Sequence, residues 1–144
     1  MIPPAYLLLS MLSMIILHLL FPGFVFACFS LFIFGLALIA LGFSLVAWSA
    51  KLFSNAGTPI RPFEETSTLV IWGPYRHSRN PIYIGMFIML LGVALALGSV
   101  TPFLLIPAFI MIIRQKFVLN EERLLIKRFG NDYQQYCAKV RRWL

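Results

Sequence analysis

Four long runs of apolar residues, none of which contains a charged side chain, constrain the fold of this chain more than any other feature. They cover about 5–20, 24–50, 81–97 and 100–113. A helix crosses the hydrocarbon core of a bilayer with about 20 apolar residues. The second run is long enough to cross with tilt, and the fourth is short for a span. We therefore predict one all-α integral membrane domain over 1–144, a bundle of about four transmembrane helices.

Composition supports this class and excludes two others. Hydrophobic residues make up 60% of the 144 residues and charged residues 12%, against roughly 45–50% and about 25% in soluble domains. A small soluble domain cannot hide so much apolar surface, and disordered chains are polar and poor in aromatic residues. The first run follows no Lys or Arg, unlike a cleavable signal peptide, which predicts a retained span.

All charged residues lie in two polar segments, 51–80 and 114–144. With four crossings these segments fall on the same side of the membrane, and the positive-inside rule makes that side the cytoplasm. We therefore predict a cytoplasmic loop 51–80, a cytoplasmic tail 114–144 and both termini inside. The predicted location is the cell inner membrane, with the polar chemistry facing the cytoplasm. Because the net charge of +7 is explained by topology, no nucleic-acid partner is predicted.

Other site classes lack support in the sequence. The cysteines Cys28 and Cys137 and the histidines His18 and His77 are too far apart to suggest a disulfide or a metal site. No Rossmann GxGxxG, Walker loop or HExxH motif is present. The uncharged runs also argue against an ion channel or a proton relay.

Small residues recur every seven positions in the second and third runs. They are Gly35, Gly42 and Ser49, followed by Gly85, Gly92 and Ser99. Seven residues are nearly two helical turns, so each set forms a stripe that lets two helices approach closely. Gly98-Ser99 between the last two runs predicts the tight turn of a helical hairpin.

The polar tail has helical periodicity that is interrupted at Gly130-Asn131. Glycine fits the end of one helix, and Asn fits the N-cap of the next. Apolar and aromatic residues beyond this point line one face of an amphipathic segment. They are Tyr133, Tyr136, Val140 and Trp143. Two interpretations stay open: the face lies in the headgroup region, or it packs against the loop 51–80.

The densest polar motif, 69–85, directly precedes and begins the third run. Gly73-Pro74 marks a turn, Pro81 suits the first turn of a helix, and Asn80 is the expected N-cap. The free N–H groups and the positive dipole end of such a helix suit a polar or anionic ligand group at the membrane surface. The alternative is an interfacial anchor, because Trp, Tyr and Arg are enriched there.

A pair of carboxylates, Glu121 and Glu122, follows the fourth run. Neighbouring residues on a helix point about 100° apart, so the two face different partners. If the fourth helix continues into the tail, Arg114 and Glu121 share a face. A carboxylate here suits orienting an amine, binding a ribose hydroxyl or acting as a base. A solvated helix face with weak ion pairs is the alternative.

These motifs together resemble those of the isoprenylcysteine carboxyl methyltransferase family and its relatives, the phospholipid N-methyltransferases. The resemblance extends over about 58–142. It is carried by Gly73-Pro74-Tyr75-Arg76, Arg79-Asn80-Pro81, Tyr83, Gly85, Glu121-Glu122, Phe129-Gly130, Tyr133 and Tyr136. It implies an integral membrane methyltransferase that uses S-adenosylmethionine and a lipophilic acceptor, either a carboxylate or an amine.

By position, the resemblance implies a cofactor pocket in the polar motif. Its residues are Ser67, Thr68, Leu69, Val70, Tyr75, Asn80, Pro81, Ile82 and Tyr83. It implies that Glu121 or Glu122 is catalytic, and Arg114 is a nearby cation on the same helix. Asn80 stands where the best-studied members carry His, and both side chains donate and accept hydrogen bonds.

The eukaryotic carboxyl methyltransferases carry an Arg one turn before the functional Glu, where this chain has Phe117 and Val118. This difference argues against a prenylcysteine carboxylate as the acceptor. Two hypotheses of other classes remain. One is a non-enzymatic four-helix membrane protein that binds anionic lipid or a partner. The other is an NADPH-binding reductase, suggested by a distant likeness to the C-terminal region of sterol reductases.

Overall fold

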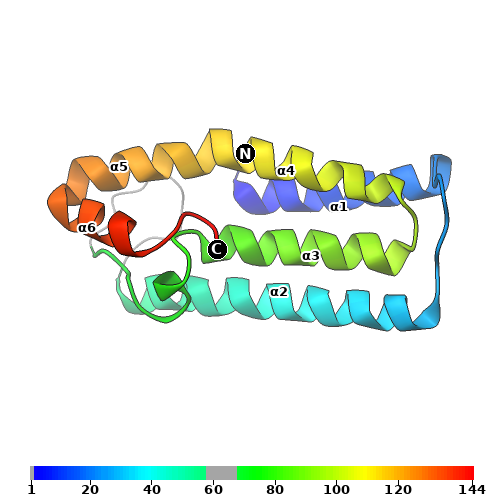
Figure 1. Cartoon of the computed structure of the whole chain (residues 1–144), viewed down its shortest axis with the longest axis horizontal. Helices are drawn as coiled ribbons and strands as arrows, with labels where there is room; N and C mark the ends of the chain where they lie inside the picture. Colours follow the sequence, from blue (N-terminus) through cyan, green and yellow to red (C-terminus); the bar gives the residue numbers. More distant parts are fainter. Residues whose placement is uncertain (1, 58–67) are drawn as a thin grey trace.

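The computed structural model describes residues 2–57 and 68–144, and within them the chain is an elongated bundle of helices (Figure 1). The helices are α1 Pro3–Leu20, α2 Phe29–Asn55, α3 Pro81–Leu97, α4 Leu105–Ile113, α5 Leu119–Phe129 and α6 Asn131–Lys139. Short helical turns are η1 Gly73–Arg76, η2 Thr101–Leu104 and η3 Arg114–Val118. This arrangement confirms the predicted all-α membrane bundle.

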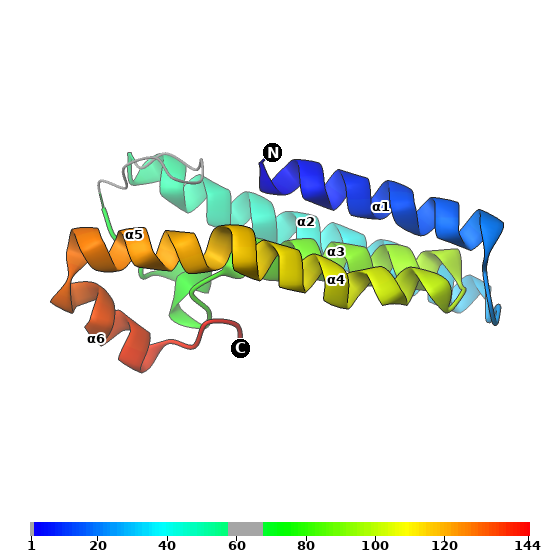
Figure 2. The same ribbon diagram turned by 90° about the horizontal axis from the view of Figure 1, so that it is seen from above.

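Helix α3 lies at the centre of the bundle and contacts α1, α2 and α4 (Figures 1 and 2). The buried core lies mainly between α1, α3 and α4, where Met14 and Leu90 are fully buried. Many large apolar side chains on α1 and α2 are exposed instead, among them Leu8, Phe34 and Phe43. Exposed apolar surface of this extent on helices long enough to cross a bilayer is the surface that lipid covers.

The two small-residue stripes bring α2 and α3 into backbone contact, as predicted. A methyl group added at Gly42 would lie 2.5 Å from the carbonyl oxygen of Gly85, and one added at Gly35 would lie 2.5 Å from that of Gly92. No side chain larger than hydrogen fits at these positions without displacing a helix. The contact therefore fixes the register of α2 on α3, and with it the position of the residues that begin α3.

The second apolar run is helical over a different range from the predicted 24–50. Residues 24–28 are not helical: Val25 forms an isolated β-bridge with Ser99. Val100 N–H donates to the Phe24 carbonyl (3.2 Å), and Phe26 N–H donates to the Gly98 carbonyl (2.8 Å). Helix α2 then continues through Asn55, beyond the predicted end. Gly98 has a φ of +68° at the end of α3, which confirms the predicted tight turn of the hairpin.

The fourth run continues without a break into the tail, so that Thr101–Phe129 forms one helical rod (Figure 2). Its middle, η3, is a single π-helical turn. A π turn holds about one residue more than an α turn, so it changes which residues before and after it share a face. Arg114 is exposed whereas Glu121 is partly buried. The expectation that they share a face assumed an unbroken α-helix, which the π turn interrupts.

We predict that Gly42→Ala lowers the free energy of unfolding by about 1–3 kcal/mol, because the added methyl group overpacks the contact with Gly85. Unfolding of the purified protein in detergent measures this. The matched control on the same helix is Ser44→Ala, at an exposed position, for which the change should stay within about 0.5 kcal/mol. Equal stability of the two variants would contradict the close contact.

Candidate functional site

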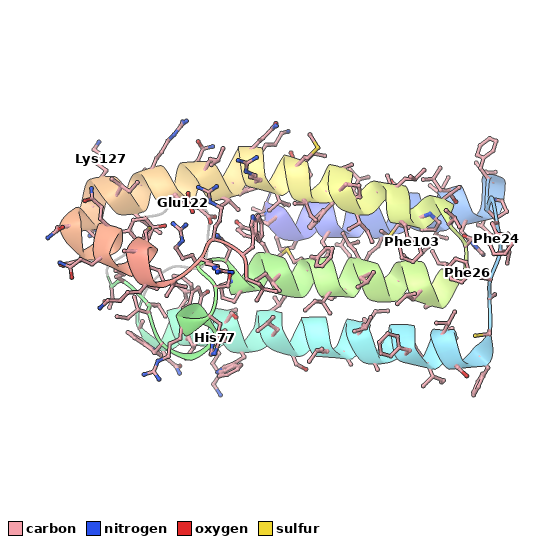
Figure 3. The ribbon with its side chains drawn as sticks, in the orientation of Figure 1. Phe24, Phe26, His77, Phe103, Glu122 and Lys127 are labelled. Atoms are coloured by element: carbon pink, nitrogen blue, oxygen red, sulfur yellow. The ribbon has the colours of Figure 1, made fainter. Side chains whose placement is uncertain are left out.

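The polar side chains gather at the end of the bundle where α3 begins and α5 and α6 meet. Figure 3 shows Glu122, Lys127 and His77 at this end, and Phe24, Phe26 and Phe103 at the opposite end. This separation of polar from apolar residues follows from the sequence, because the uncharged runs all extend away from the polar end. The site is thus built by the loop before α3, by α5, by α6 and by residues 140–144.

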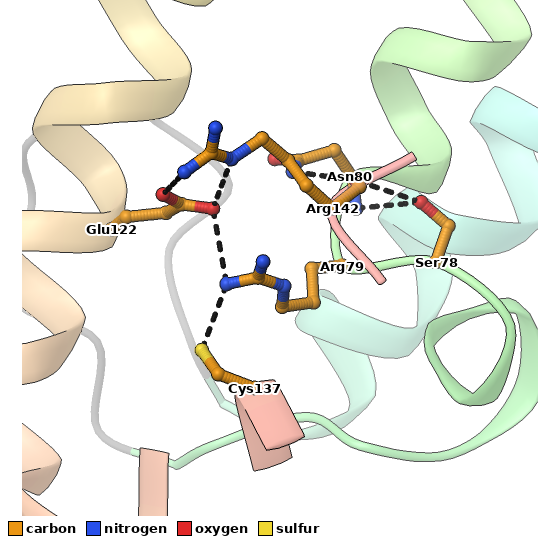
Figure 4. Close-up of polar contacts among 6 residues, drawn as sticks. All are labelled: Ser78, Arg79, Asn80, Glu122, Cys137 and Arg142. Carbon is orange, nitrogen blue, oxygen red and sulfur yellow. Dashed lines mark hydrogen bonds and ion pairs between the residues drawn. The ribbon is translucent and has the colours of Figure 1, made fainter. Parts of the chain in front are cut away.

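Glu122 is the centre of a cluster of charges (Figure 4). Its Oε1 accepts from Arg142 Nε at 2.9 Å and its Oε2 from Arg142 Nη2 at 2.8 Å, a bidentate pair. Arg79 Nη1 lies 3.2 Å from Oε1 and also donates to Cys137 Sγ at 2.8 Å. The hydrogen bonds to Glu122 raise the pKa of Arg142. Glu122 therefore joins three segments that are distant in sequence.

Asn80 occupies the predicted cap position of α3, but its side chain has a different partner. Its amide nitrogen Nδ2 donates to the Arg142 carbonyl at 3.0 Å, and no side-chain cap hydrogen bond is formed. Ser78 Oγ donates to the same carbonyl at 3.1 Å, and Arg79 N–H donates to the Arg141 carbonyl at 3.0 Å. The loop before α3 thus holds residues 141–142 by three hydrogen bonds.

Glu121 points to a different partner from Glu122, as the helix geometry predicts. Tyr83, in the first turn of α3, donates its hydroxyl proton to Glu121 Oε1 at 2.7 Å. The guanidinium groups of Arg79 and Arg142 contact Glu122 instead. Burial raises the pKa of Glu121, against the opposing effect of the hydrogen bond from Tyr83, so this carboxylate is a better proton acceptor than a solvated one.

An apolar groove of about 240 Å³ begins at Tyr83 and runs between α3 and α4. It is lined by Tyr83, Ile84, Phe87, Phe109, Ile110, Ile113, Trp143 and Leu144. One end of the groove is therefore the ring whose hydroxyl binds Glu121. The groove walls are apolar, and the Tyr83 hydroxyl connects them with the Glu121 carboxylate. A ligand with a hydrocarbon part fits the groove when its polar group points toward this hydroxyl.

The tail packs against the loop, which supports the second of the two interpretations of its apolar face. Tyr133, Tyr136 and Val140 are buried and pack against Leu69. Tyr136 OH donates to the Tyr75 carbonyl at 2.6 Å. Burial raises the pKa of Tyr136 to about 12, against the opposing effect of the Arg79 charge, so this donor stays protonated at neutral pH.

Two details of the tail differ from the predictions. Gly130 ends α5, as expected, but it also occupies the cap position of α6, so Asn131 is the first helical residue and not the N-cap. Trp143 does not continue the face of α6, because the helix ends at Lys139 and Val140 is extended. Trp143 reaches the groove instead.

Most of the predicted cofactor residues lie together at this end. Val70, Tyr75, Asn80, Pro81 and Tyr83 are buried there, whereas Leu69 and Ile82 are partly buried, Thr68 is exposed, and Ser67 lies outside the described residues. Of the predicted catalytic residues, Glu121 and Glu122 lie at this end, whereas Arg114 is exposed and is the first residue of the π turn η3.

Two buried polar atoms of the site have no hydrogen-bond partner within the part of the chain that the structure describes: the Tyr75 hydroxyl and Arg79 Nε. Burial raises the pKa of Tyr75, with Tyr136 and Glu121 adding to the effect, so this hydroxyl is a proton donor. Unpartnered buried donors are costly. Their presence beside Asn80 and Tyr83 fits a bound ligand with polar groups.

Arg142 and Cys137 belong to this cluster but were not among the predicted site residues. Arg142 follows α6 in an extended segment, so no helical periodicity connects it with Glu122. Arg79 stands within the motif Arg79-Asn80-Pro81, but Arg76 precedes it in the same segment, so charge alone did not distinguish it. These contacts depend on how the tail folds back, which local sequence does not specify.

Comparison with known proteins shows which protein family the sequence of this chain matches. The model of the phospholipid methyltransferase family matches residues 30–132. An uncharacterized protein of Haemophilus influenzae is 38% identical over 63 residues, which are 44% of this chain and 100% of that protein. The protein-S-isoprenylcysteine O-methyltransferase of Schizosaccharomyces pombe is 36% identical over 72 residues, 50% of this chain and 30% of that enzyme. No solved structure matches.

We predict that Glu122→Ala destabilises the protein by about 2–3 kcal/mol, because it leaves two guanidinium groups without their shared carboxylate. The loss is smaller than for a fully buried pair, since the Arg142 side chain is 33% exposed. Unfolding in detergent measures the effect. The matched control is Asp132→Ala, an exposed acidic residue at the start of α6. An equally small change for both variants would refute the structural role of Glu122.

Proposed function

The chain belongs to the phospholipid methyltransferase family, and we propose on this premise that it transfers a methyl group from S-adenosylmethionine to a lipophilic acceptor at the cytoplasmic face of the membrane. The observation that carries the proposal is the pairing of Tyr83 with Glu121 at the head of an apolar groove. A polar reacting group and a hydrocarbon part of one molecule are accommodated side by side there.

The cofactor residues that we propose fit the chemistry of S-adenosylmethionine. The cofactor carries an amino acid group, ribose hydroxyls and an adenine, and it supplies a methyl group on a cationic sulfur. The unpartnered Tyr75 hydroxyl and Arg79 Nε–H are donors for such polar groups. The remaining contacts are assigned to 67–70 and to the first turn of α3, Asn80–Tyr83. The aromatic faces of Tyr75 and Tyr83 favour a nearby cation.

The protein contributes mainly position to such a reaction. Methyl transfer is an in-line displacement, and holding nucleophile and methyl group in near-attack geometry removes a large part of the barrier. The loop before α3 and the α5 helix are joined through Glu122 and its two arginines. This rigid connection holds the cofactor side and the acceptor side of the site at a fixed separation.

An amine fits the acceptor position better than a carboxylate does. The two arginines contact Glu122, and Glu121 lies beside the Tyr83 hydroxyl, where burial raises the pKa of its carboxyl group. A carboxylate in this place pairs with an ammonium group and repels a second carboxylate. A protonated amine must also lose a proton before it attacks, and Glu121 is placed to accept it.

Titration of the detergent-purified protein with S-adenosylmethionine, S-adenosylhomocysteine and NADPH tests the cofactor. Saturable binding of the first two alone is expected. Tyr83→Ala and Glu122→Gln should abolish this binding, and retained affinity in both variants would overturn the pocket assignment. Binding of NADPH alone would favour a reductase, and binding of none by the folded protein would favour a lipid-binding protein without activity.

We predict that Glu121→Gln slows methyl transfer to an amine acceptor by about 10²- to 10⁴-fold while S-adenosylmethionine still binds, because the amide cannot accept the proton. Transfer of radioactive methyl to phosphatidylethanolamine in vesicles measures the rate. Arg123→Gln, at the exposed position next to Glu122, is the matched control and should retain the rate. A fully active Glu121→Gln enzyme would exclude Glu121 as the base.

A further inference from the structure

Residues 140–144, here called the strap, extend from the end of α6 back across the beginning of α3 (Figure 1). The strap is anchored on both sides. The loop before α3 holds the carbonyls of Arg141 and Arg142, and α5 holds the Arg142 guanidinium through Glu122. Its conformation is therefore fixed by contacts to other segments and not by its own secondary structure.

The residue after this anchor, Trp143, packs against the core and lines the groove between α3 and α4. Across the groove lie Ile84 and Phe87 of α3 and Ile110 and Ile113 of α4. All of these are apolar, and they stand in helices that lie within the hydrophobic part of the bundle. The polar end of the groove is Tyr83, bonded to Glu121. A hydrocarbon chain of a membrane lipid is the occupant that suits such walls.

Resting on the proposed function, we propose that Trp143 is a specificity-determining residue of the acceptor site. Its indole forms one wall of the groove and so limits the length and bulk of the hydrocarbon chain that lies beside Tyr83. Arg142 is the positioning residue for Trp143, because its bidentate bond to Glu122 fixes the backbone immediately before the indole.

The physical basis is the sensitivity of apolar pockets to size. One methylene group more or less in a close-fitting pocket changes the specificity constant by about 10- to 200-fold. Removing an indole from a groove of about 240 Å³ enlarges it by much more than a methylene group. The groove should then accept longer or bulkier chains without any change in the groups that handle the methyl transfer.

The first test measures chain preference in vesicles of phosphatidylethanolamine with dodecanoyl, hexadecanoyl and octadecanoyl chains in equal amounts. Mass spectrometry of the methylated lipids gives kcat/KM ratios for the three chains. For Trp143→Ala we expect a shift of about tenfold toward the longer chains, with unchanged affinity for S-adenosylmethionine. The control Trp48→Ala removes an exposed indole from α2 and should leave the ratios as in the wild type. Unchanged ratios in an active Trp143→Ala enzyme would overturn the proposal.

The positioning role of Arg142 is tested in the same assay with two variants, one that removes the side chain and one that keeps its charge. Arg142→Ala should produce the same direction of shift as Trp143→Ala, because the strap loses its anchor. Arg142→Lys, which keeps the charge but not the bidentate geometry, should restore part of the preference. A loss of kcat that is equal for all three chains would show a general structural role instead and overturn the positioning role.

A second test does not depend on activity, so it separates this proposal from the proposed function. Trp48→Phe and Trp72→Phe together leave Trp143 as the sole tryptophan. In vesicles of phosphatidylethanolamine brominated on its acyl chains, a chain in the groove quenches the fluorescence of Trp143. Adding Ile110→Phe, which fills the groove, should reduce this quenching. Adding Met111→Phe, at the neighbouring exposed position, should not.

The outcomes of the second test are distinct. Quenching that Ile110→Phe reduces and Met111→Phe does not would place a lipid chain against Trp143 even if no methyl transfer is found. A variant with Trp48 as the sole tryptophan, on the exposed surface of α2, reports that the brominated lipid quenches as intended. If Trp48 is quenched and Trp143 is not, or if both phenylalanine variants act alike, the chain does not occupy the groove and the proposal fails.

Discussion

The carboxylate of Glu122 bonds to two guanidinium groups that come from opposite ends of the polar region: Arg79 before α3 and Arg142 after α6. This contact joins the loop before α3, the rod that contains α5 and the strap. Its two oxygens face the two arginines in a largely buried place, where an ion pair is strong only if its geometry is good. The positions of Asn80 and Trp143 follow from it, since both are attached to Arg142 or adjacent to it.

A bilayer imposes the rest of the arrangement. Placing a charged group within the hydrocarbon costs much free energy, so the charged residues of the chain lie at one end of the bundle. Within the hydrocarbon, the helices pack through apolar and small side chains. The backbone contacts of Gly42 with Gly85 and of Gly35 with Gly92 supply that packing. By fixing α2 against α3, they also fix where α3 begins. The glycine stripes therefore help to position the polar site, because Asn80 and Tyr83 lie at the beginning of the helix that the stripes hold.

Those parts of the structure that depend on local pattern could be predicted from the sequence. Uncharged runs specify membrane helices, seven-residue spacing specifies the α2–α3 contact, and the 100° between neighbouring helical residues separates Glu121 from Glu122. The rest depends on features without a local signature. The π turn that moves Arg114 away from the face of Glu121 is a change in backbone hydrogen bonding, and Arg142 meets Glu122 only because an extended segment folds back across α3.

The adjacent glutamates show how consecutive residues of one helix can take different partners. Two carboxylates with the same partners would repel each other and compete for the same cations. On a helix they diverge, so Glu122 bonds to both arginines and Glu121 accepts a hydrogen bond from Tyr83. Glu122 then stabilises the structure, while Glu121 contacts a different group. Because Tyr83 also lines the apolar groove, its hydroxyl connects the groove with the Glu121 carboxylate.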